Sequence, residues 1–286
     1  MKLKADFVSD WLSSLKDILE NAWGYNIDGI KDEELPYIYF NAEKKRPRLR
    51  RRNVILADTF ECPTDLQAGW DRLKDLIETG RDITPHLSKS VIRPNDRDSM
   101  LDDWGVHHFH LGEELEKGFV KRTGPLLFAL ITNNAFYAIG VYHHGAWANL
   151  DIIETIHRNW PSAISKFRIN GLTSTGNITE QQRLALRAKQ GNTFTIVSDG
   201  TTYAPIGGGV VSAGYNIQAI IKTDMEKAKL ESLQEWLDSQ LNEIREELVE
   251  HGYAGEAEIE AKLVITDIEY IAILPKYNIE IVLVKK

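Results

Sequence analysis

Hydrophobic side chains recur every three to four positions in several stretches of the chain, which is the repeat of an amphipathic helix. The first such stretch is residues 5–24, where Phe7, Trp11, Leu15 and Leu19 fall on one side. The same repeat predicts further helices over residues 66–79, 149–160, 178–191 and 224–251. Glycine or proline stands at or directly after the last residue of each of these later stretches, where helices commonly end.

Other stretches have the alternating or continuous apolar pattern of strands. Residues 125–132 are apolar almost throughout and predict a buried central strand, while residues 104–112 and 136–144 predict strands on either side of it. A short Asn-Asn-Ala turn joins the last two, so an antiparallel meander is expected. Further strands are predicted over residues 35–40, 52–60, 193–206 (as a hairpin), 260–273 and 277–286.

Helices and antiparallel strands do not follow a regular β-α-β alternation, which predicts an α+β fold. Serine, glycine, asparagine and threonine accumulate near residues 162–176, and we place a domain boundary there. Residues 1–165 would then combine N-terminal helices with an antiparallel sheet. Residues 166–286 would form a smaller accessory or oligomerisation unit, also α+β, with the long helix 224–251.

Length and composition are those of a globular protein, with 286 residues of which 43% are hydrophobic. No apolar run approaches the roughly 20 residues of a membrane span, so no membrane partner is expected. The N-terminal pattern is that of a helix of the mature fold and not of a signal peptide. The single cysteine, Cys62, excludes an intramolecular disulfide and favours the cytoplasm as the compartment.

The net charge of −8 gives no overall attraction to nucleic acid, but the charges are unevenly placed. One interpretation of the basic side chains is contact with a polyanion such as RNA, through neutralisation of its phosphates. The other is a solvated surface loop. The basic residues concerned are Lys44, Lys45, Arg46, Arg48, Arg50, Arg51 and Arg52, with Lys89, Arg93 and Lys121 elsewhere in the chain.

Histidines are concentrated in two short runs, DDWGVHHFHLG at residues 102–112 and GVYHHGAW at residues 140–147. Neighbouring side chains on a strand point to opposite faces. His108 and His110 therefore share one face of the first run, and His107 lies on the other, apolar face. His107 is accordingly expected in the core.

The second run supplies a further imidazole. If the two outer strands flank residues 125–132, His108 and His110 converge with one of His143 or His144 on a single surface of the sheet. Such a surface would carry several groups that change protonation near neutral pH.

Three interpretations of these histidines are open. They are structural residues bonded to neighbouring carbonyls, or metal ligands together with nearby carboxylates, or acid and base groups that cleave RNA without a metal. The metal interpretation lacks the spacing of ligand motifs such as H-E-x-x-H. The third uses one imidazole to take the 2′-hydroxyl proton, another to protonate the leaving oxygen, and Lys or Arg to stabilise charge at phosphorus.

The succession WGVHHFHLG, PLLFALIT and FYAIGVYHHG resembles the sheet of the RelE-type toxin ribonucleases, which are grouped with the barnase, EndoU and colicin-type ribonucleases. The resemblance covers residues 86–160. It implies an association with a toxin or phage-defence system. It also implies that His108, His110 and His144 are the acid and base groups, with Arg122 and Tyr142 as phosphate contacts.

The sequence thus predicts a metal-independent ribonuclease without a cofactor, whose partner is RNA. One alternative is a non-enzymatic interaction protein with structural histidines, in which helix 224–251 binds a second copy or another protein. The other alternative is a metal-dependent phosphodiesterase or related hydrolase. The glycine cluster at residues 207–214 lacks the Lys-Ser/Thr of a phosphate-binding P-loop and is expected to form a turn.

Overall fold

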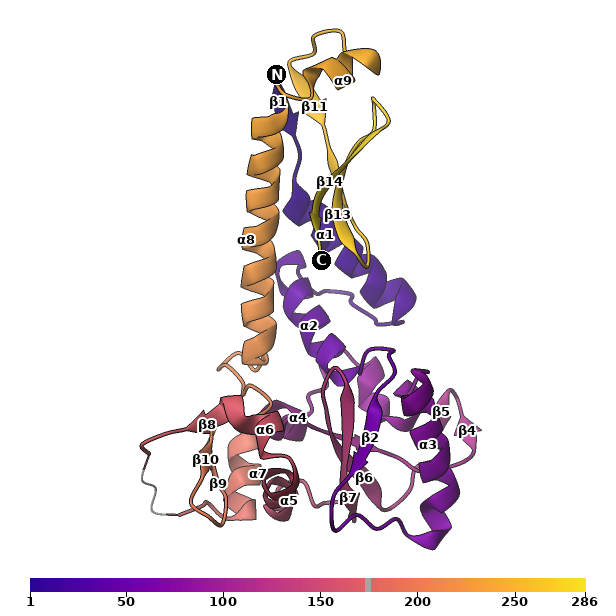
Figure 1. Cartoon of the computed structure of the whole chain (residues 1–286), viewed down its shortest axis with the longest axis vertical. Helices are drawn as coiled ribbons and strands as arrows, with labels where there is room; N and C mark the ends of the chain where they lie inside the picture. The colour runs from indigo at the N-terminus through magenta and orange to yellow at the C-terminus, as the bar shows by residue number, and fades with distance from the viewer. Residues whose placement is uncertain (173–175) are drawn as a thin grey trace. The chain divides into compact units, whose positions relative to one another are not determined.

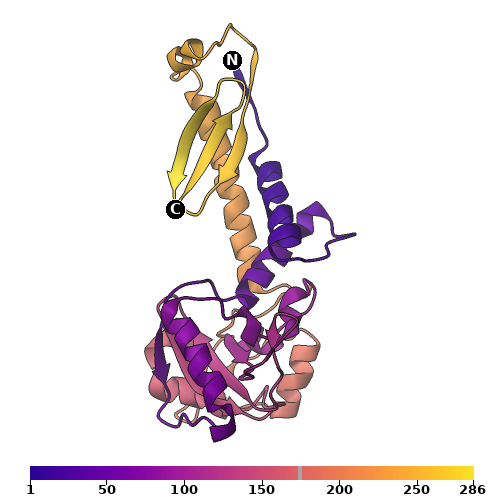
Figure 2. The same cartoon turned by 90° about the vertical axis from the view of Figure 1, so that its right-hand side faces the viewer.

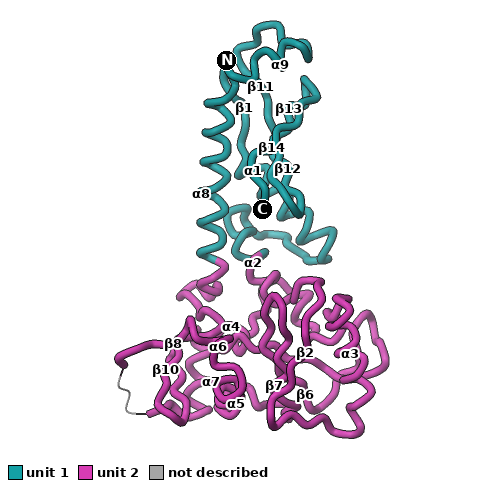
Figure 3. Tube along the Cα trace, in the orientation of Figure 1, with its two compact units in different colours: residues 1–39, 220–286 teal, residues 40–219 magenta. Residues whose placement is uncertain are grey.

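The structure, a computed structural model, describes residues 1–172 and 176–286. It contains helices and several small sheets, which confirms the predicted α+β class. The chain forms two compact units (Figure 3): unit 1 comprises residues 1–39 and 220–286, and unit 2 comprises residues 40–219. The chain leaves unit 1 within helix α2 (Leu35–Lys45) and returns to it within helix α8 (Ile217–Gln240).

Unit 2 is built on a four-stranded sheet with the strand order β2-β7-β6-β3 (Figure 1). The strands are β2 (Asn53–Leu56), β3 (Val106–Phe109), β6 (Leu126–Ile131) and β7 (Ala135–Tyr142). Strand β6 runs antiparallel to both β3 and β7, while β2 is parallel to β7. The predicted meander with its apolar strand in the centre is therefore confirmed, and β3 lies at one edge of the sheet.

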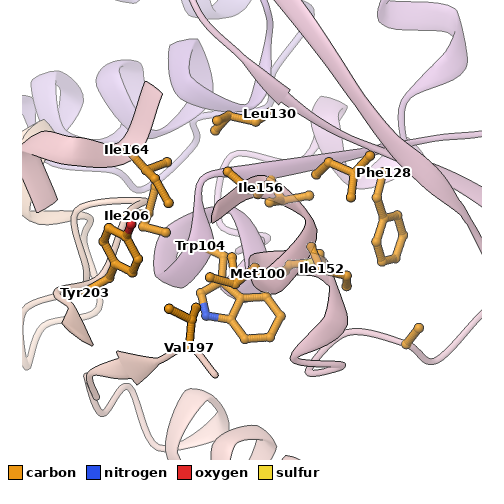
Figure 4. Close-up of a cluster of buried hydrophobic side chains, with 14 of the residues drawn as sticks. Met100, Trp104, Phe128, Leu130, Ile152, Ile156, Ile164, Val197, Tyr203 and Ile206 are labelled. Carbon is orange, nitrogen blue, oxygen red and sulfur yellow. The ribbon is translucent and has the colours of Figure 1, made fainter. Parts of the chain in front are cut away.

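Helices cover both faces of this sheet (Figure 1). Helix α3 (Gln67–Thr79) packs on the face that bears Phe109 and Leu127. Helices α4 (Ser99–Trp104) and α5 (Asp151–Asn159) pack on the opposite face, in the buried cluster drawn in Figure 4. Burial on both faces explains why β6 has an apolar sequence throughout.

The rest of unit 2 consists of short elements. The hairpin predicted within residues 193–206 is present, and its turn includes Gly200 with a φ of 86°. A second, shorter hairpin lies between β3 and β6 in the chain. The bounds of these elements are β4 (Leu115–Glu116), β5 (Phe119–Val120), α6 (Pro161–Ile164), β8 (Arg168–Ile169), α7 (Glu180–Ala188), β9 (Thr195–Ile196) and β10 (Thr202–Tyr203).

The predicted domain boundary near residues 162–176 falls inside unit 2, so residues 166–219 do not separate from the sheet. The physical reason is a shared core: Val197 and Tyr203 are buried in the same cluster as Trp104 (Figure 4). The polar stretch connects elements within one unit, and residues 173–175 of it lie outside the described residues.

Unit 1 joins the first and last parts of the chain. In Figure 2, helix α8 runs alongside a three-stranded antiparallel sheet of order β12-β13-β14, and Tyr270 of β13 donates a hydrogen bond of 2.5 Å to Glu226 of α8. Strand β1 pairs in parallel with β11. The bounds are β1 (Lys2–Lys4), α1 (Phe7–Asp17), α9 (Arg245–Glu250), β11 (Glu258–Glu260), β12 (Lys262–Ile265), β13 (Glu269–Leu274) and β14 (Ile279–Lys285).

Residues 35–40 form the start of helix α2, so the prediction of a strand there is wrong. Leu35, Ile38 and Ala42 are all buried, which is helical spacing that the aromatic and β-branched composition obscured. Pro36 is compatible with this helix because the first turn needs no backbone donor at that position. The C-terminal segment also contains one hairpin more than predicted, since residues 260–273 fold back as β12 and β13.

The long helix predicted over residues 224–251 is divided into α8 and α9. Leu230, Leu237, Leu241 and Leu248 of its apolar face are buried, so this face packs within the chain. No helix in the described part of the chain is long and apolar enough to cross a membrane.

Candidate functional site

His108 of strand β3 lies beside a carboxylate that is fixed by a helix terminus. Asp98 is the N-cap of α4, and its Oδ1 accepts a hydrogen bond of 3.0 Å from the backbone N–H of Leu101. Its Oδ2 lies 3.4 Å from Nδ1 of His108, and the two side chains are only 17% and 15% exposed. The cap holds the carboxylate in place beside the imidazole, although Nδ1 of His108 makes no hydrogen bond among the described residues.

Trp147 connects His108 with a histidine from the other run. The ring centroid of Trp147 is 5.0 Å from that of His108 and 5.1 Å from that of His144, both with edge-on geometry. Trp147 also stacks on Phe128 of β6, with the centroids 5.6 Å apart. Imidazoles from β3 and from the turn after β7 therefore contact one indole. His144 follows the last residue of β7, so alternation along the strand does not place it.

His110 lies inside this group but is buried, with 7% of its surface exposed. The backbone N–H of Thr123 donates a hydrogen bond of 3.3 Å to its Nδ1. Burial lowers the pKa of His110 to about 4, and the positive charges of His108, Arg122 and His144 act in the same direction. Of the acid and base roles predicted for His110, proton donation near neutral pH is thus disfavoured. Arg122 is exposed, and its charge acts on His110.

Tyr142 is placed differently from its predicted role as a phosphate contact. Its ring stacks on Phe128 with the centroids 5.1 Å apart, at the margin of the Trp104 cluster. Burial raises the pKa of Tyr142, and its side chain is hydrogen-bonded to Thr155 of α5. Tyr142 therefore supports the sheet face on which Trp147 rests.

The remaining two histidines of the runs have separate surroundings. His107 is buried, as predicted, and its Nε2 lies 3.2 Å from the carbonyl oxygen of Lys44. Burial lowers the pKa of His107 to about 4. His143 is exposed, and its Nδ1 lies 3.2 Å from the carbonyl oxygen of His144. His143 therefore offers a neighbouring imidazole for comparison with His144.

A hollow of about 260 Å³ lies against β3, and its lining includes Lys45, Ser90, Asp98, His107 and His108. The ammonium of Lys45 donates hydrogen bonds to the carbonyl oxygens of Ser90, Arg93 and Asp96, at 3.4, 2.9 and 2.8 Å. Burial lowers the pKa of Lys45 to about 8. Lys45 thus holds the segment that precedes α4 and is not placed for the predicted contact with nucleic acid.

Other members of the predicted basic stretch also have partners inside the protein. Arg52 is buried and donates to the carbonyl oxygens of Thr132 at 2.9 Å and of Arg48 at 3.0 Å. Lys44 donates to the carbonyl oxygen of Gly207 and lies 3.5 Å from Asp102. Further contacts join Arg46 to the carbonyl oxygen of Val91, at 3.3 Å, and Arg48 to Glu43.

The other basic residues predicted to contact nucleic acid are exposed or half-buried, and some of them pair with carboxylates. Arg50 and Arg51 are exposed, and Lys89 is half-buried. Arg93 lies 3.3 Å from Asp96, and Lys121 lies 3.8 Å from Glu114. Only part of the predicted basic stretch is therefore available to a polyanion.

Metal-ligating side chains do not gather in the part of the chain that the structure describes. Within residues 1–172 and 176–286, no group of three or more His, Cys, Asp and Glu side chains is arranged to hold a metal ion. The histidine group differs from such a site because His108 and His144 border an indole, and the carboxylate of Asp98 lies close to His108 and not between the two imidazoles.

Two residues of this site were missed by the sequence analysis. Asp98 stood in a polar, irregular segment, although Asp followed by Ser-Met-Leu carries the signal of a helix N-cap. Trp147 closes the run GVYHHGAW, but it follows the end of β7 and cannot be placed by strand alternation.

Comparison with protein-family models, with curated proteins and with solved structures finds no match for this chain.

Acidification is expected to destabilise the protein between pH 6.5 and pH 4. His107 and His110 have pKa values lowered to about 4, whereas unfolded histidines titrate near 6.5. In this window the unfolded chain binds more protons than the folded chain, so the free energy of unfolding falls as the pH falls. Urea unfolding at pH 7, 6 and 5 measures how steeply the free energy of unfolding depends on pH. His107→Gln should make this dependence less steep, and His143→Gln should leave it unchanged. Equal slopes in the wild type and His107→Gln would contradict burial of His107.

Proposed function

We propose that the protein is a metal-independent endoribonuclease and that His108 and His144 are its acid and base groups. The observation that carries the proposal is their convergence on Trp147, from strand β3 and from the turn after β7. Arg122 is an exposed cation whose charge acts on the neighbouring His110. The single cysteine is consistent with action in the reducing cytoplasm.

The reaction requires only groups that the chain provides. The 2′-oxygen of a ribose attacks the adjacent phosphorus, and its proton passes to the neutral imidazole of His144. The bond from phosphorus to the 5′-oxygen breaks, and protonated His108 donates a proton to that oxygen. Asp98 stabilises the imidazolium of His108, and Arg122 stabilises the charge on the non-bridging oxygens. The products are a 2′,3′-cyclic phosphate and a 5′-hydroxyl.

The roles of the two imidazoles follow from their surroundings. His108 has the carboxylate of Asp98 beside Nδ1, so Nε2 is the nitrogen assigned to act on RNA. His144 is exposed, so a substrate can reach it. His110 serves as a neutral neighbour that fixes the loop before β6 through its hydrogen bond with Thr123.

Cleavage of RNA in the presence of EDTA tests the proposal. The purified full-length protein should cut a single-stranded RNA at unchanged rate when EDTA is added, and the fragments should carry 2′,3′-cyclic phosphate ends. An otherwise identical substrate with a 2′-deoxyribose at the cleavage position should resist. Cleavage that stops in EDTA and returns with a divalent ion would instead support a metal-dependent phosphodiesterase.

Asp98→Asn should lower kcat for RNA cleavage by about tenfold or more, because the imidazolium of His108 loses its carboxylate partner. Asparagine caps helices as well as aspartate does, so the variant should keep its stability. Asp6→Asn is the matched control, since Asp6 caps α1 in the same way, with a 2.8 Å bond from Ser9. A loss of activity in both variants, or in neither, would contradict the role of Asp98.

A second candidate function, a non-enzymatic interaction protein, is favoured by one observation. Met225 and Trp236 of α8 are 67% and 44% exposed, and their spacing places them on one side of the helix. We take a second copy of this chain as the partner. Size-exclusion chromatography with light scattering should then give the mass of a dimer for the wild type. The Met225→Glu variant should have the mass of a monomer. A monomeric wild type would remove this candidate.

A further inference from the structure

A second hollow, of about 380 Å³, lies in unit 2 on another side of helix α4. The lining comes from the start and end of α4, from the end of α7 and from the glycine cluster that follows β10. Its polar side chains include Arg97, Ser99, Asp102, Asp103, Arg187 and Asn192.

Asp103 is a buried carboxylate with an incomplete set of hydrogen bonds. Its Oδ2 accepts from Arg183 at 2.9 Å and from Nε of Arg187 at 3.0 Å. Its Oδ1 has no hydrogen-bond partner among the described residues, although only 7% of the residue is exposed. A buried acceptor without a partner is costly, so an N–H group entering the hollow would be favoured at this oxygen.

Arg187 presents a donor beside this acceptor. Its Nη2 lies 2.9 Å from Oδ2 of Asp103 but makes no hydrogen bond among the described residues, and the residue is 8% exposed. An acceptor and a donor without hydrogen bonds among the described residues therefore lie side by side in the lining of the hollow, each with less than 1 Å² of accessible surface. A ligand that fits must carry an N–H donor and an acceptor on the same edge, as a nucleobase does.

The carboxylate of Asp103 and the guanidinium of Arg187 favour guanine over the other bases. Guanine presents N–H donors at N1 and N2 and acceptors at O6 and N7, and guanidinium groups pair most often with O6 and N7. Arg97 is exposed at the lining and can meet a phosphate attached to the base. We propose that this hollow binds a guanine base of the RNA substrate, with its N1–H at Asp103 and its O6, on the same edge, at Arg187.

This inference rests on the proposed ribonuclease, and two contacts connect the hollow with the imidazoles. Arg187 donates through Nη1 to the carbonyl oxygen of Trp147, the residue whose ring contacts His108 and His144. Ser99 of the hollow directly follows Asp98, which pairs with His108. A base held in the hollow would therefore set which phosphodiester reaches the histidines.

Calorimetric titration of the full chain with GMP, AMP, CMP and UMP tests the site without any cleavage. GMP should bind at least tenfold more tightly than the other nucleotides. Ser99→Trp, which fills the hollow from an exposed position, should weaken GMP binding at least tenfold. Ser13→Trp, at an exposed position of α1, should leave GMP binding unchanged.

Cleavage mapping then separates this proposal from the ribonuclease itself. Cuts should cluster beside guanosine in a mixed-sequence RNA, and Ser99→Trp should remove that preference. His144→Ala should bind GMP like the wild type while losing cleavage. GMP binding without any RNA cleavage would sink the ribonuclease and leave the guanine site standing. Equal affinity for GMP and AMP, or cleavage without preference for guanosine, would overturn the guanine assignment.

Discussion

Alanine at His144 or at His108 is expected to lower the rate of RNA cleavage by about 10²- to 10⁴-fold, the contribution of a single acid or base group. Each variant removes an imidazole that borders Trp147 and leaves the sheet intact, because His144 follows β7 and His108 is at an edge strand. The measurement is the single-turnover rate on a defined RNA in EDTA, with near-ultraviolet circular dichroism to verify packing.

The matched control for this result is His143→Ala. His143 has the same side chain as His144, lies next to it and is equally exposed, but its imidazole contacts the backbone of His144 and not Trp147. It should retain most of the activity. Equal losses at positions 143 and 144 would mean that the run acts through general charge and not through one placed imidazole. Full activity of His108→Ala would remove the acid from the mechanism.

Asp103→Ala is expected to lower the free energy of unfolding by about 3–5 kcal/mol, because it leaves Arg183 and Arg187 buried without their counter-charge. Both guanidinium groups are almost fully buried and lie over Trp104, with their central carbons 5.1 and 4.4 Å from the ring centroid. Urea unfolding at pH 7 measures the change. Asp58→Ala removes an exposed carboxylate that pairs with Arg158, and it should cost far less.

A triple variant distinguishes charge from shape. Replacing Asp103 with Leu and both Arg183 and Arg187 with Met removes the whole ionic group and keeps apolar volume. This variant should recover much of the stability that Asp103→Ala loses, because the desolvation penalty of all three charges disappears. If the triple variant is as unstable as Asp103→Ala, the geometry of the side chains and not the unpaired charge determines the effect.

The central part of unit 2 was predictable because its pattern is local and strong. Continuous burial makes β6 apolar throughout, which predicted it as the central strand of a meander, while the full strand order came only from the structure. Alternation along β3 then separated buried His107 from His108 at the site. The contact of His108 with His144 depends on Trp147, which lies beyond the last strand residue and has no periodicity to place it.

Other features depend on long-range packing that a linear pattern does not carry. The basic stretch suggested a surface for RNA, yet Lys45 and Arg52 are buried and satisfy carbonyl groups. A run of basic residues does not indicate which of the side chains are buried. Each side chain can bury its aliphatic part and donate hydrogen bonds to backbone carbonyl groups. The domain boundary was misplaced for a related reason: a polar loop within one unit has the same composition as a linker between two.

The assembly of unit 1 from both ends of the described chain dictates an order of events on the ribosome. Strand β1 pairs Leu3 with Ile259, so it cannot find its neighbour until residues 220–286 have been translated. Unit 2 is contiguous in the sequence and can fold while residues 1–39 still lack the rest of unit 1. A nascent chain would therefore be able to bring His108 and His144 to Trp147 before residues 220–286 are translated.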